Sequence, residues 1–455
     1  MNKLLYLFSA SEKLFTEFSP ILQKQGFNKF VGIAYGKNKV FRDFDFDEII
    51  YVSDLELDVM NGNNDLINNI PQIEKSLEIT IANCIHADRH LMRKNKSIRA
   101  NLANKIVDSI ITLIERHEID IVVSANAADL ASFFTAKYCH KKSIKFIYPI
   151  PSRIGDELIF AHKIDNSPIN YIQRFHENLT VNKSEHEQFV KNYISHKKQP
   201  SYVNSSLAFK YFTLEQFKDF FRFLYRYLGD KRSLHFSETP IRVIFNKFKK
   251  IVRKIGYSRV SKTKNVSGKY FIFPLQFIPE AATLVQGNKL HEMKTIIEII
   301  SKSIPIEYKL IVKEHKVCVG RRPKKFYKEI LKFHNVELVN DNYDVYELIE
   351  RSSGVISISS TMGIEAMMME KPIGVFGENY YNHSNNVYLM HNLYEIEDQI
   401  MKMINHNFDK NDLLSILKTL LDSSFSGNMH PKDYSGLDNL PNIKEYISRL
   451  ERKSA

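Results

Sequence analysis

The chain has 455 residues, of which 44% are hydrophobic and 25% charged, and its formal net charge is +12. This composition is typical of a globular protein and excludes a disordered, fibrous or low-complexity chain, while the length predicts about two or three domains. Three widely spaced cysteines argue against a disulfide framework, and no apolar run reaches the roughly 18 residues that span a bilayer. We therefore expect a cytoplasmic protein whose contact with a membrane is at most peripheral.

Apolar runs and helix-like stretches alternate through the first half of the chain. The predicted elements are a strand over 3–9, a helix over 12–25, strands over 29–36 and 48–54, helices over 70–93 and 97–117, a strand over 120–125, a helix over 127–140 and a strand over 144–151. Strands that alternate with helices predict a parallel sheet covered on both faces. We expect a doubly wound α/β domain over residues 1–240, with a helical insertion.

The same alternation starts again at residue 269. The predicted elements are a strand over 269–276, a helix over 289–303, a strand over 307–315, a helix over 323–334, a strand over 336–340, a helix over 345–351 and strands over 354–359 and 371–377. This predicts a second doubly wound domain over 269–455, with helices at its carboxyl end. Two such domains are expected to face a central cleft, with ligands at the carboxyl ends of the strands.

A basic segment lies between the two predicted domains. Residues 241–264 contain nine Lys and Arg residues and no acid, and their apolar residues recur at helical spacing. The pattern predicts a basic amphipathic helix in a linker over 241–268. Such a helix suits an anionic membrane surface, or it packs its apolar face between domains. Since no nucleic-acid-binding module is evident elsewhere, we expect no nucleic acid partner.

Polar side chains follow the predicted strands of the second domain. They are Gln276 after the first strand, Lys313, Glu314 and His315 after the second, and Ser359, Ser360 and Thr361 after the fourth, with Gly363 and Glu365 in the helix that comes next. A helix N-terminus has unpaired N–H groups and a partial positive charge, so the hydroxyl turn suits a phosphate, although Ser and Thr also cap helices. Because the carboxyl ends of parallel strands share one edge, we predict a binding site there.

These segments carry a resemblance to a known family. The stretches FPLQFIPEAAT at 273–283, IVKEHKVCVGRR at 311–322 and NYDVYELIERSSGVISISSTMGIEAMMMEKPIGVFG at 342–377 resemble the nucleotide-binding half of the GT-B glycosyltransferases of capsular polysaccharide synthesis, in particular the Kdo-transferase-like capsule proteins. The similarity covers about residues 269–385, with a weaker echo in YPIPSRIGDELIF at 148–160. It implies the GT-B fold, with two Rossmann-like domains.

The resemblance also implies roles for individual residues. In this family a His-Pro motif and a Ser-Ser or Ser-Thr motif hold the donor phosphate, which implies that role for His315 and for Ser359, Ser360 and Thr361, although Lys316 follows His315 here in place of proline. The carboxylate of Glu365 would lie near the nucleotide ribose, or it is a first-turn acid favoured by the helix dipole. Gln276, Lys313, Glu314 and Gly363 complete the expected donor site.

An inverting transfer also needs a base that takes the proton from the acceptor hydroxyl. Asp129 and Asp156 follow predicted strands of the first domain and are the candidates, although loop aspartates more often cap helices or turns. Arg153 suits an acidic sugar or a phosphate, because a guanidinium binds either anion. Charge on the leaving phosphate is then met by His315, the hydroxyls and the helix N-terminus, and we expect no metal and no cofactor.

The resemblance therefore predicts a glycosyltransferase that moves a sugar from a nucleotide donor to a growing surface glycan, on the cytoplasmic side of the membrane. A CMP-Kdo-like donor is favoured and a UDP-sugar remains open. The alternatives are a polyol-phosphate transferase, a nucleotide-sugar 2-epimerase of the same fold, and a non-catalytic capsule-assembly protein.

Overall fold

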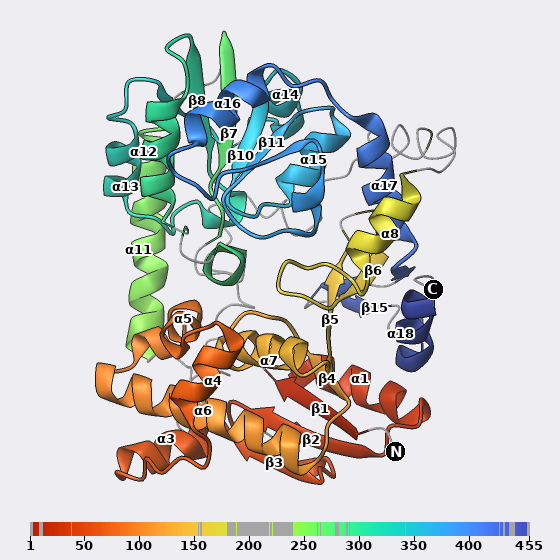
Figure 1. The fold of residues 1–455 in the computed structure, drawn as a ribbon. Helices are drawn as coiled ribbons and strands as arrows, with labels where there is room; N and C mark the ends of the chain where they lie inside the picture. The colour runs from red at the N-terminus through yellow and green to blue at the C-terminus, as the bar shows by residue number, and fades with distance from the viewer. Residues whose placement is uncertain are drawn as a thin grey trace. The chain divides into compact units, whose positions relative to one another are not determined.

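The computed structural model describes residues 3–8, 12–37, 39–152, 154, 157–179, 188, 218, 221, 240–261, 263, 265–277, 282–287, 290, 292–341, 343–426, 428–430, 433–435 and 442–452. The chain divides into two compact units (Figure 1). The first unit comprises Met1–Phe175, Arg226–Ser237 and Thr419–Ala455, and the second comprises His176–Tyr225 and Glu238–Lys418.

The first unit contains a seven-stranded sheet in the order β13-β6-β5-β4-β1-β2-β3. Its strands are β1 (Lys3–Phe8), β2 (Lys29–Ala34), β3 (Glu48–Tyr51), β4 (Ile121–Ser124), β5 (Lys145–Pro151), β6 (Glu157–Ala161) and β13 (Ser424–Ser426). Strands β1 to β5 are parallel, whereas β6 and β13 are antiparallel to their neighbours. The helices are α1 (Glu12–Lys24), α2 (Lys39–Asp43), α3 (Val52–Met60), α4 (Ile70–Leu77), α5 (Ile81–Ala87), α6 (Lys96–Arg116), α7 (Leu130–Lys141) and α18 (Ile443–Arg452), and α8 (Tyr171–Asn178) crosses the boundary between the units.

The predicted helix over 70–93 is interrupted in the structure. Helix α4 ends at Leu77, the following Glu78 adopts a left-handed conformation with φ 54°, and Thr80 then caps α5 through its side chain. A left-handed residue cannot continue a helix, and a following hydroxyl cap starts a new one. The prediction of one continuous helix was therefore wrong.

The carboxyl-terminal segment belongs to the first unit. Strand β13 pairs with β6, and Phe425 and Tyr446 are part of the buried cluster that also contains Phe160. The ring centroids of Phe160 and Tyr446 are 5.3 Å apart in an edge-to-face arrangement. We predicted from the sequence that this segment belongs to the second domain. The structure differs because β13 and α18 pack their apolar side chains against the first sheet.

The second unit contains a parallel six-stranded sheet in the order β12-β11-β10-β7-β8-β9. Its strands are β7 (Lys269–Pro274), β8 (Tyr308–Lys313), β9 (Val336–Val339), β10 (Gly354–Ser357), β11 (Ile373–Val375) and β12 (Val387–Leu389). Its helices are α11 (Pro240–Ser258), α12 (Met293–Ser303), α13 (Lys324–Ile330), α14 (Val345–Glu350), α15 (Met362–Met368) and α16 (Ile396–Ile404), and α17 (Lys410–Leu421) runs into the first unit's part of the chain. In chain order of the strands this is the doubly wound order 3-2-1-4-5-6.

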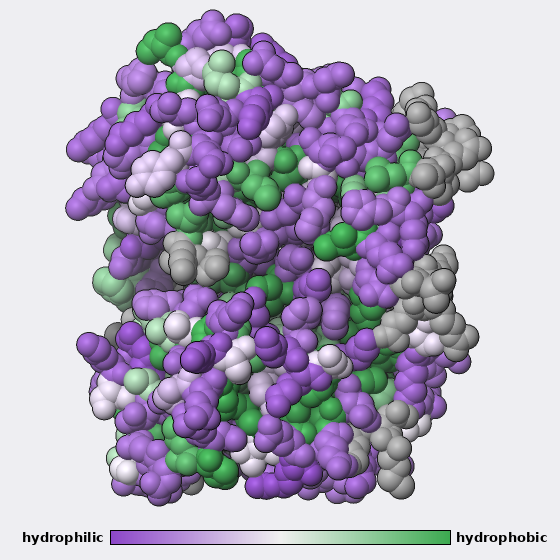
Figure 2. All heavy atoms as spheres, in the orientation of Figure 1, coloured by the Kyte–Doolittle hydropathy of each residue, from purple (hydrophilic) through white to green (hydrophobic). Residues whose placement is uncertain are grey.

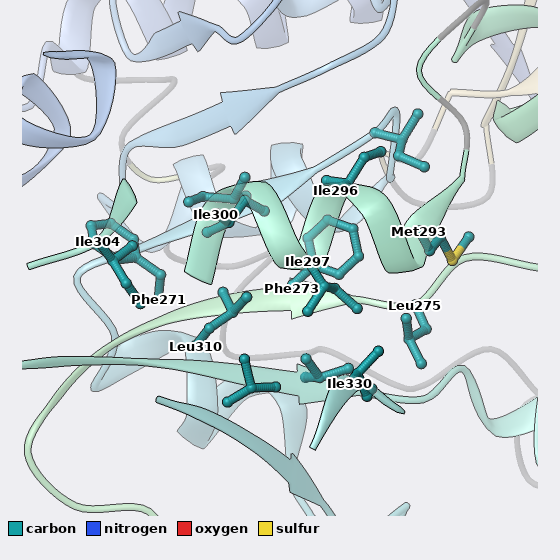
Figure 3. Close-up of a cluster of buried hydrophobic side chains, with 14 of the residues drawn as sticks. Phe271, Phe273, Leu275, Met293, Ile296, Ile297, Ile300, Ile304, Leu310 and Ile330 are labelled. Atoms are coloured by element: carbon teal, nitrogen blue, oxygen red, sulfur yellow. The ribbon is translucent and has the colours of Figure 1, made fainter. Parts of the chain in front are cut away.

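A large apolar core lies between the second sheet and helices α12, α13 and α16. Figure 3 shows Met293, Ile297 and Ile300 of α12 against Phe273 of β7 and Leu310 of β8, and all five are buried. Burial of this kind contributes about 25 cal/mol per Å² of apolar surface removed from water. The core therefore fixes the strands whose carboxyl ends carry the predicted site. The two predicted α/β units are confirmed, whereas a cleft between them stays a prediction.

Candidate functional site

The doubly wound order of the second sheet defines where its ligand edge lies. The chain leaves β7 toward β8 and β9 on one side, and then returns to β10, β11 and β12 on the other. The strand order therefore reverses between β7 and β10, and such sheets bind ligands at the carboxyl ends of the strands beside this switch point.

Gln276 and Ser359 lie beside this switch point. Phe271 of β7 is paired with Gly354 of β10, and Ile272 with Val355. Gln276 and Ser359 each lie two residues beyond the carboxyl end of their strand, β7 and β10 respectively. On the other side of β10 the Gly377 amide donates to the Ile358 carbonyl over 2.8 Å, which holds the end of β11 against β10.

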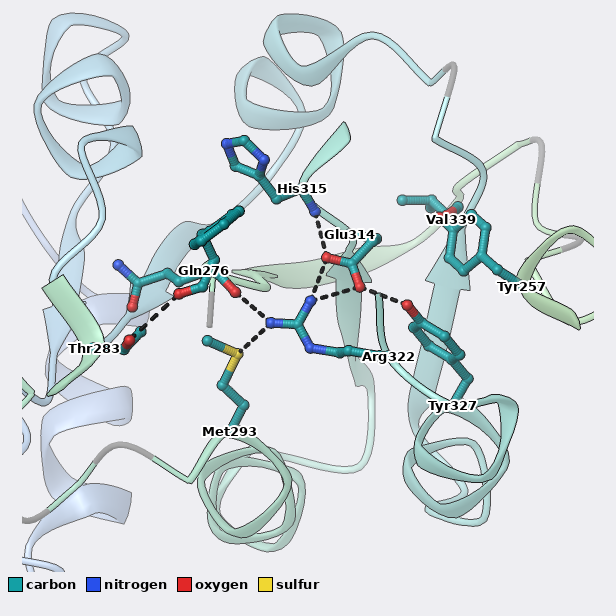
Figure 4. Close-up of polar contacts among 10 residues, drawn as sticks. Tyr257, Gln276, Thr283, Met293, Glu314, His315, Arg322, Tyr327 and Val339 are labelled. Carbon is teal, nitrogen blue, oxygen red and sulfur yellow. Dashed lines mark hydrogen bonds and ion pairs between the residues drawn. The ribbon is translucent and has the colours of Figure 1, made fainter. Parts of the chain in front are cut away.

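Glu314 is the centre of a buried polar network under this edge (Figure 4). Its carboxylate oxygens lie 2.6 and 2.7 Å from Nη1 of Arg322, and it accepts hydrogen bonds from the Tyr327 hydroxyl at 2.6 Å and the His315 amide at 2.7 Å. Arg322 also donates to the Gln276 carbonyl. Burial raises the pKa of Glu314, and the Arg322 charge opposes this. Because Glu314 is only 1% exposed, it positions the ends of β7 and β8, in place of the direct donor contact predicted for it.

Lys313 has a similar supporting place. Its ammonium group donates to the carbonyls of Asn340, Asp341 and Tyr343, at 3.4, 3.3 and 2.9 Å, and so holds the loop between β9 and α14. Burial lowers the pKa of Lys313 to about 8, with a further contribution from Lys316. Its charge is used inside the protein, so the structure does not present Lys313 as a direct phosphate ligand.

The side chain of His315 is exposed at the end of β8, whereas its backbone is fixed. The His315 amide donates to Glu314, and its carbonyl accepts from the Cys318 amide over 2.7 Å. Partial desolvation, followed by the charges of Arg322 and Arg321, lowers the pKa of His315. A neutral imidazole with one N–H donor is therefore the dominant form at neutral pH.

The hydroxyl turn follows β10 and is clamped from one side by Tyr381. The Tyr381 hydroxyl donates to the Ser360 carbonyl over 2.7 Å, and Ser360 Oγ accepts from the Met362 amide over 3.1 Å. Thr361 occupies the cap position of α15 with an exposed side chain that makes no capping hydrogen bond. Ser360 and Thr361 are both residue types that commonly cap helices. Ser360 accepts a hydrogen bond from the first turn of α15, whereas the Thr361 side chain does not.

Gly363 provides the room that Tyr381 needs. A Cβ atom at Gly363 would lie 2.6 Å from the Tyr381 hydroxyl and 2.8 Å from its ring. Ser359 is buried, and Glu365 is half-buried in the first turn of α15, as predicted for a first-turn acid. The glycine therefore serves packing against Tyr381, and the closeness of that packing fixes the turn.

Asp129, the predicted base of the first unit, is a helix cap. Its Oδ1 accepts from the Ser132 amide at 2.9 Å and from the Ser132 hydroxyl at 2.8 Å, at the start of α7. Asp88 bonds the same helix end, because its Oδ2 accepts from the Leu130 amide over 3.1 Å. Burial, then the Asp88 charge, raises the pKa of Asp129 to about 6. The other two predicted residues of this unit, Asp156 and Arg153, lie outside the described residues.

Sequence reasoning missed Arg322, Tyr381, Asn379 and Asn382. Arg322 was within a quoted motif, but its pairing with Glu314 depends on a bend of the chain that residue spacing does not show. Asn379 and Asn382 follow β11, so the same strand-end rule, applied to the last predicted strand, would have found them. Within the described part of the chain, no group of three or more His, Cys, Asp and Glu side chains could hold a metal ion, and no helix is long and apolar enough to cross a bilayer.

Among solved structures, the chain is similar to two structures of Thermosulfurimonas dismutans KpsC and to an epimerase. The KpsC β-Kdo 2,7 transferase is 12% identical, with 76% of this chain and 89% of that chain covered and a TM-score of 0.35. The KpsC β-Kdo 2,4 transferase is 14% identical, with coverages of 72% and 87% and a TM-score of 0.33. The UDP-GlcNAc 2-epimerase from Neisseria meningitidis is 14% identical, with coverages of 92% and 100% and a TM-score of 0.25.

No curated protein sequence matches the chain. The model of the family described as capsule polysaccharide biosynthesis protein, in contrast, matches residues 150–385. This match covers more than half of the chain, and it contains β7 to β11 with the polar residues at their carboxyl ends. The chain belongs to the family of capsule polysaccharide biosynthesis proteins.

Proposed function

We propose that the protein is a glycosyltransferase that moves a sugar from a nucleotide donor to a growing capsular or other surface polysaccharide. The observation that carries this proposal is the placement of His315, Ser359, Ser360 and Thr361 at one edge of a doubly wound sheet, in a member of a capsule biosynthesis family. A CMP-linked acidic sugar of the Kdo type is the favoured donor, with a UDP-sugar as the second choice.

The proposed chemistry is direct displacement in a GT-B arrangement of the two units. When the sugar leaves its nucleotide, negative charge grows on the departing phosphate, and donors aimed at this charge stabilise the transition state more than the ground state. The neutral imidazole of His315 offers one N–H, and Thr361 offers an exposed hydroxyl at the first turn of α15. This mechanism assigns no step to a metal or cofactor.

The base is proposed to come from the first unit and to be Asp156 or Asp129, with Arg153 as a contact for an acidic sugar. A pKa of about 6 would leave Asp129 charged at neutral pH, as a base must be. Its burial in the α7 cap speaks against it, because a substrate hydroxyl must come within hydrogen-bond reach of the base. Asp156→Asn and Asp129→Asn, assayed side by side, distinguish the two.

Ligand-induced stabilisation tests the nucleotide-binding part of the proposal. A ligand that binds only the folded state must raise the midpoint of thermal unfolding. We expect CMP to do so, alone or more than UDP, GDP and CDP at equal concentration. A shift with UDP alone would move the donor to a UDP-sugar, and no shift with any of the four would contradict the proposal.

We further propose that α11 attaches the protein to the anionic cytoplasmic face of the cell membrane. Its exposed apolar side chains recur at three- and four-residue intervals along one face, and they are Ile244, Phe245, Phe248, Val252 and Ile255, each 48–65% exposed. Tyr257, on the opposite face, is buried against Tyr327, with ring centroids 5.1 Å apart. Figure 2 shows a mostly hydrophilic face with apolar atoms at the left margin, where Figure 1 places α11.

Basic side chains lie beside this apolar stripe, which favours a lipid surface over a second protein. Lys249 and Arg259 are exposed, and Lys254 is half-buried. The combination of an apolar stripe and flanking cations is typical of helices that lie in the interface of anionic membranes.

A further inference from the structure

Amide side chains with one buried, unpaired atom gather at the ligand edge of the second sheet. Among the described residues of this unit, four buried side-chain atoms have no partner, and they are Gln276 Oε1, Asn335 Oδ1, Asn379 Nδ2 and Asn382 Oδ1. Three of the four follow the carboxyl ends of β7 and β11, and only Asn335 lies at the opposite edge, directly before β9. A buried polar atom without a partner costs free energy, so such atoms are rare and call for an explanation.

Gln276 and Asn379 flank the end of β10. Gln276 lies two residues beyond the last residue of β7, the strand beside β10, and Asn379 lies two residues beyond Gly377, whose amide bonds Ile358 at the end of β10. Gln276 is 7% exposed and Asn379 is 5% exposed. Asn379 occupies the cap position of the short helix η6 (Tyr380–His383), yet its side chain makes no capping bond. Both amides are thus held beside the hydroxyl turn with unused hydrogen-bonding capacity.

We propose that Gln276 and Asn379 bind the uncharged part of the nucleotide donor, by hydrogen bonds to its sugar hydroxyls or base edge. An amide offers both donors and an acceptor, and so do hydroxyls and nucleobase edges, whereas a phosphate offers acceptors only. The unpaired Gln276 Oε1 is an acceptor and cannot bond a phosphate oxygen, and the unpaired Asn379 Nδ2 is a donor that matches the acceptors of a sugar hydroxyl or a base edge. The inference rests on the proposed function and extends it, because it divides the site into a phosphate side at His315 and Thr361 and a neutral side at the two amides.

The division explains why the amides are left unpaired. A site built to hydrogen-bond a ligand carries buried polar groups that are satisfied only when the ligand is present, and it rejects ligands that leave them unpaired. Replacement of such a group by an apolar side chain of the same size removes the cost in the free protein and removes the bond to the ligand. Stability and affinity then change in opposite directions, which a merely structural amide does not produce.

The experiment compares Gln276→Met and Asn379→Leu with the full-length wild-type protein. We expect each variant to unfold at the same or a higher temperature than wild type without ligand, and to bind CMP or UDP, whichever wild type prefers, about tenfold more weakly by calorimetry, as expected for the loss of one hydrogen bond. Inorganic pyrophosphate carries only the charged groups. Its dissociation constant, measured by competition with the nucleotide, should therefore be the same for wild type and both variants.

Asn335→Leu is the matched control, because Asn335 is the same kind of residue at the other edge of the same sheet. Its Nδ2 donates to the Ser301 carbonyl over 2.8 Å, so this variant should unfold at a lower temperature and keep wild-type nucleotide affinity. Nucleotide affinity within twofold of wild type in both test variants would overturn the inference alone. Wild-type protein that binds no nucleotide would overturn the proposed function and the inference with it.

Discussion

The carboxylate of Glu314 and the guanidinium of Arg322 form a buried ion pair, with both carboxylate oxygens within 2.7 Å of Nη1. Arg322 also donates to the Gln276 carbonyl, so the pair joins the ends of β7 and β8. The exposed His315 imidazole is carried by a backbone whose amide bonds the same carboxylate. The carboxyl ends of β7 and β8 are therefore held together by two buried residues, Glu314 and Arg322.

Arg322→Met should lower the free energy of unfolding by about 3–5 kcal/mol, because it leaves Glu314 charged and unpaired in the interior. Equilibrium denaturation in urea measures the change. Glu314→Leu combined with Arg322→Met should recover part of the loss. The neighbouring Arg321→Met, which removes a cation–π contact with Phe277 and no buried ion pair, should cost about 1 kcal/mol or less. Equal losses in the two arginine variants would contradict this account.

Gly363→Ala should destabilise the protein by about 1–3 kcal/mol, since the new methyl group collides with Tyr381. Tyr381→Phe alone should cost about 1 kcal/mol through its lost bond to the Ser360 carbonyl. In the double variant the clash with the hydroxyl is gone, so its cost should be smaller than the sum of the two. A double-variant cost equal to the sum of the two single costs would show that the two side chains are not in steric conflict.

His315→Ala should lower turnover by about 100-fold or more if the imidazole stabilises charge on the leaving phosphate. Its effect on the free energy of unfolding should stay within about 0.5 kcal/mol, because the side chain is exposed and the bonds of its backbone remain. His334→Ala, at an exposed position before β9, is the control and should be fully active. Near-normal turnover of His315→Ala would remove the residue from the mechanism.

Asp129 should make stability depend on pH between about 4 and 6. Its carboxyl titrates near 3.8 in the unfolded chain and at about 6 in the folded protein, so the folded state binds more protons in this window. The contribution of this group to stability is therefore complete below pH 4 and is lost as pH rises through 6. Asp129→Asn keeps the cap and cannot ionise, so the free energy of unfolding should fall less between pH 4 and 6 than in wild type. Parallel pH profiles would refute the raised pKa.

Vesicles that contain anionic lipid should capture the protein at low salt and release it as salt rises. Phe245→Ser combined with Phe248→Ser should abolish capture, as it removes two of the five exposed apolar side chains of α11. Tyr394→Ser, a change at a 98% exposed residue of another surface, should bind as wild type does. Sedimentation of the protein with the vesicles provides the readout, and equal binding of all three proteins would count against α11 as the anchor.

The alternation of strands and helices was readable from the sequence because buried parallel strands are continuous apolar runs, as in Tyr270–Phe273. Strand β13 was not identified, since it pairs with β6 from a segment more than 250 residues away, and β6, which pairs with the nearby β5, was also missed. The division of the chain differs for the same reason, because Phe425 and Tyr446 find their partners in the first sheet.

For the site, the sequence located the edge but not the role of each residue. Lys313, Glu314 and His315 are consecutive polar residues, yet the first two are buried and only the third is exposed. Burial of a charged side chain depends on partners such as Arg322 and the Asn340 carbonyl, which the tertiary structure supplies. The buried amides of Gln276 and Asn379 show the reverse case, because one atom of each has no hydrogen-bond partner among the described residues.

The central claim is transfer of a sugar from a nucleotide donor to a glycan, and an acceptor-dependent assay tests it most directly. Purified protein is incubated with CMP-Kdo or with a UDP-sugar, with and without a capsular oligosaccharide. The masses of the products are then measured by mass spectrometry. The account predicts an oligosaccharide heavier by one sugar and an equal amount of released nucleotide, only when donor and acceptor are both present. A nucleotide sugar converted to its epimer without acceptor, or a donor and an acceptor that both remain unchanged, would contradict it.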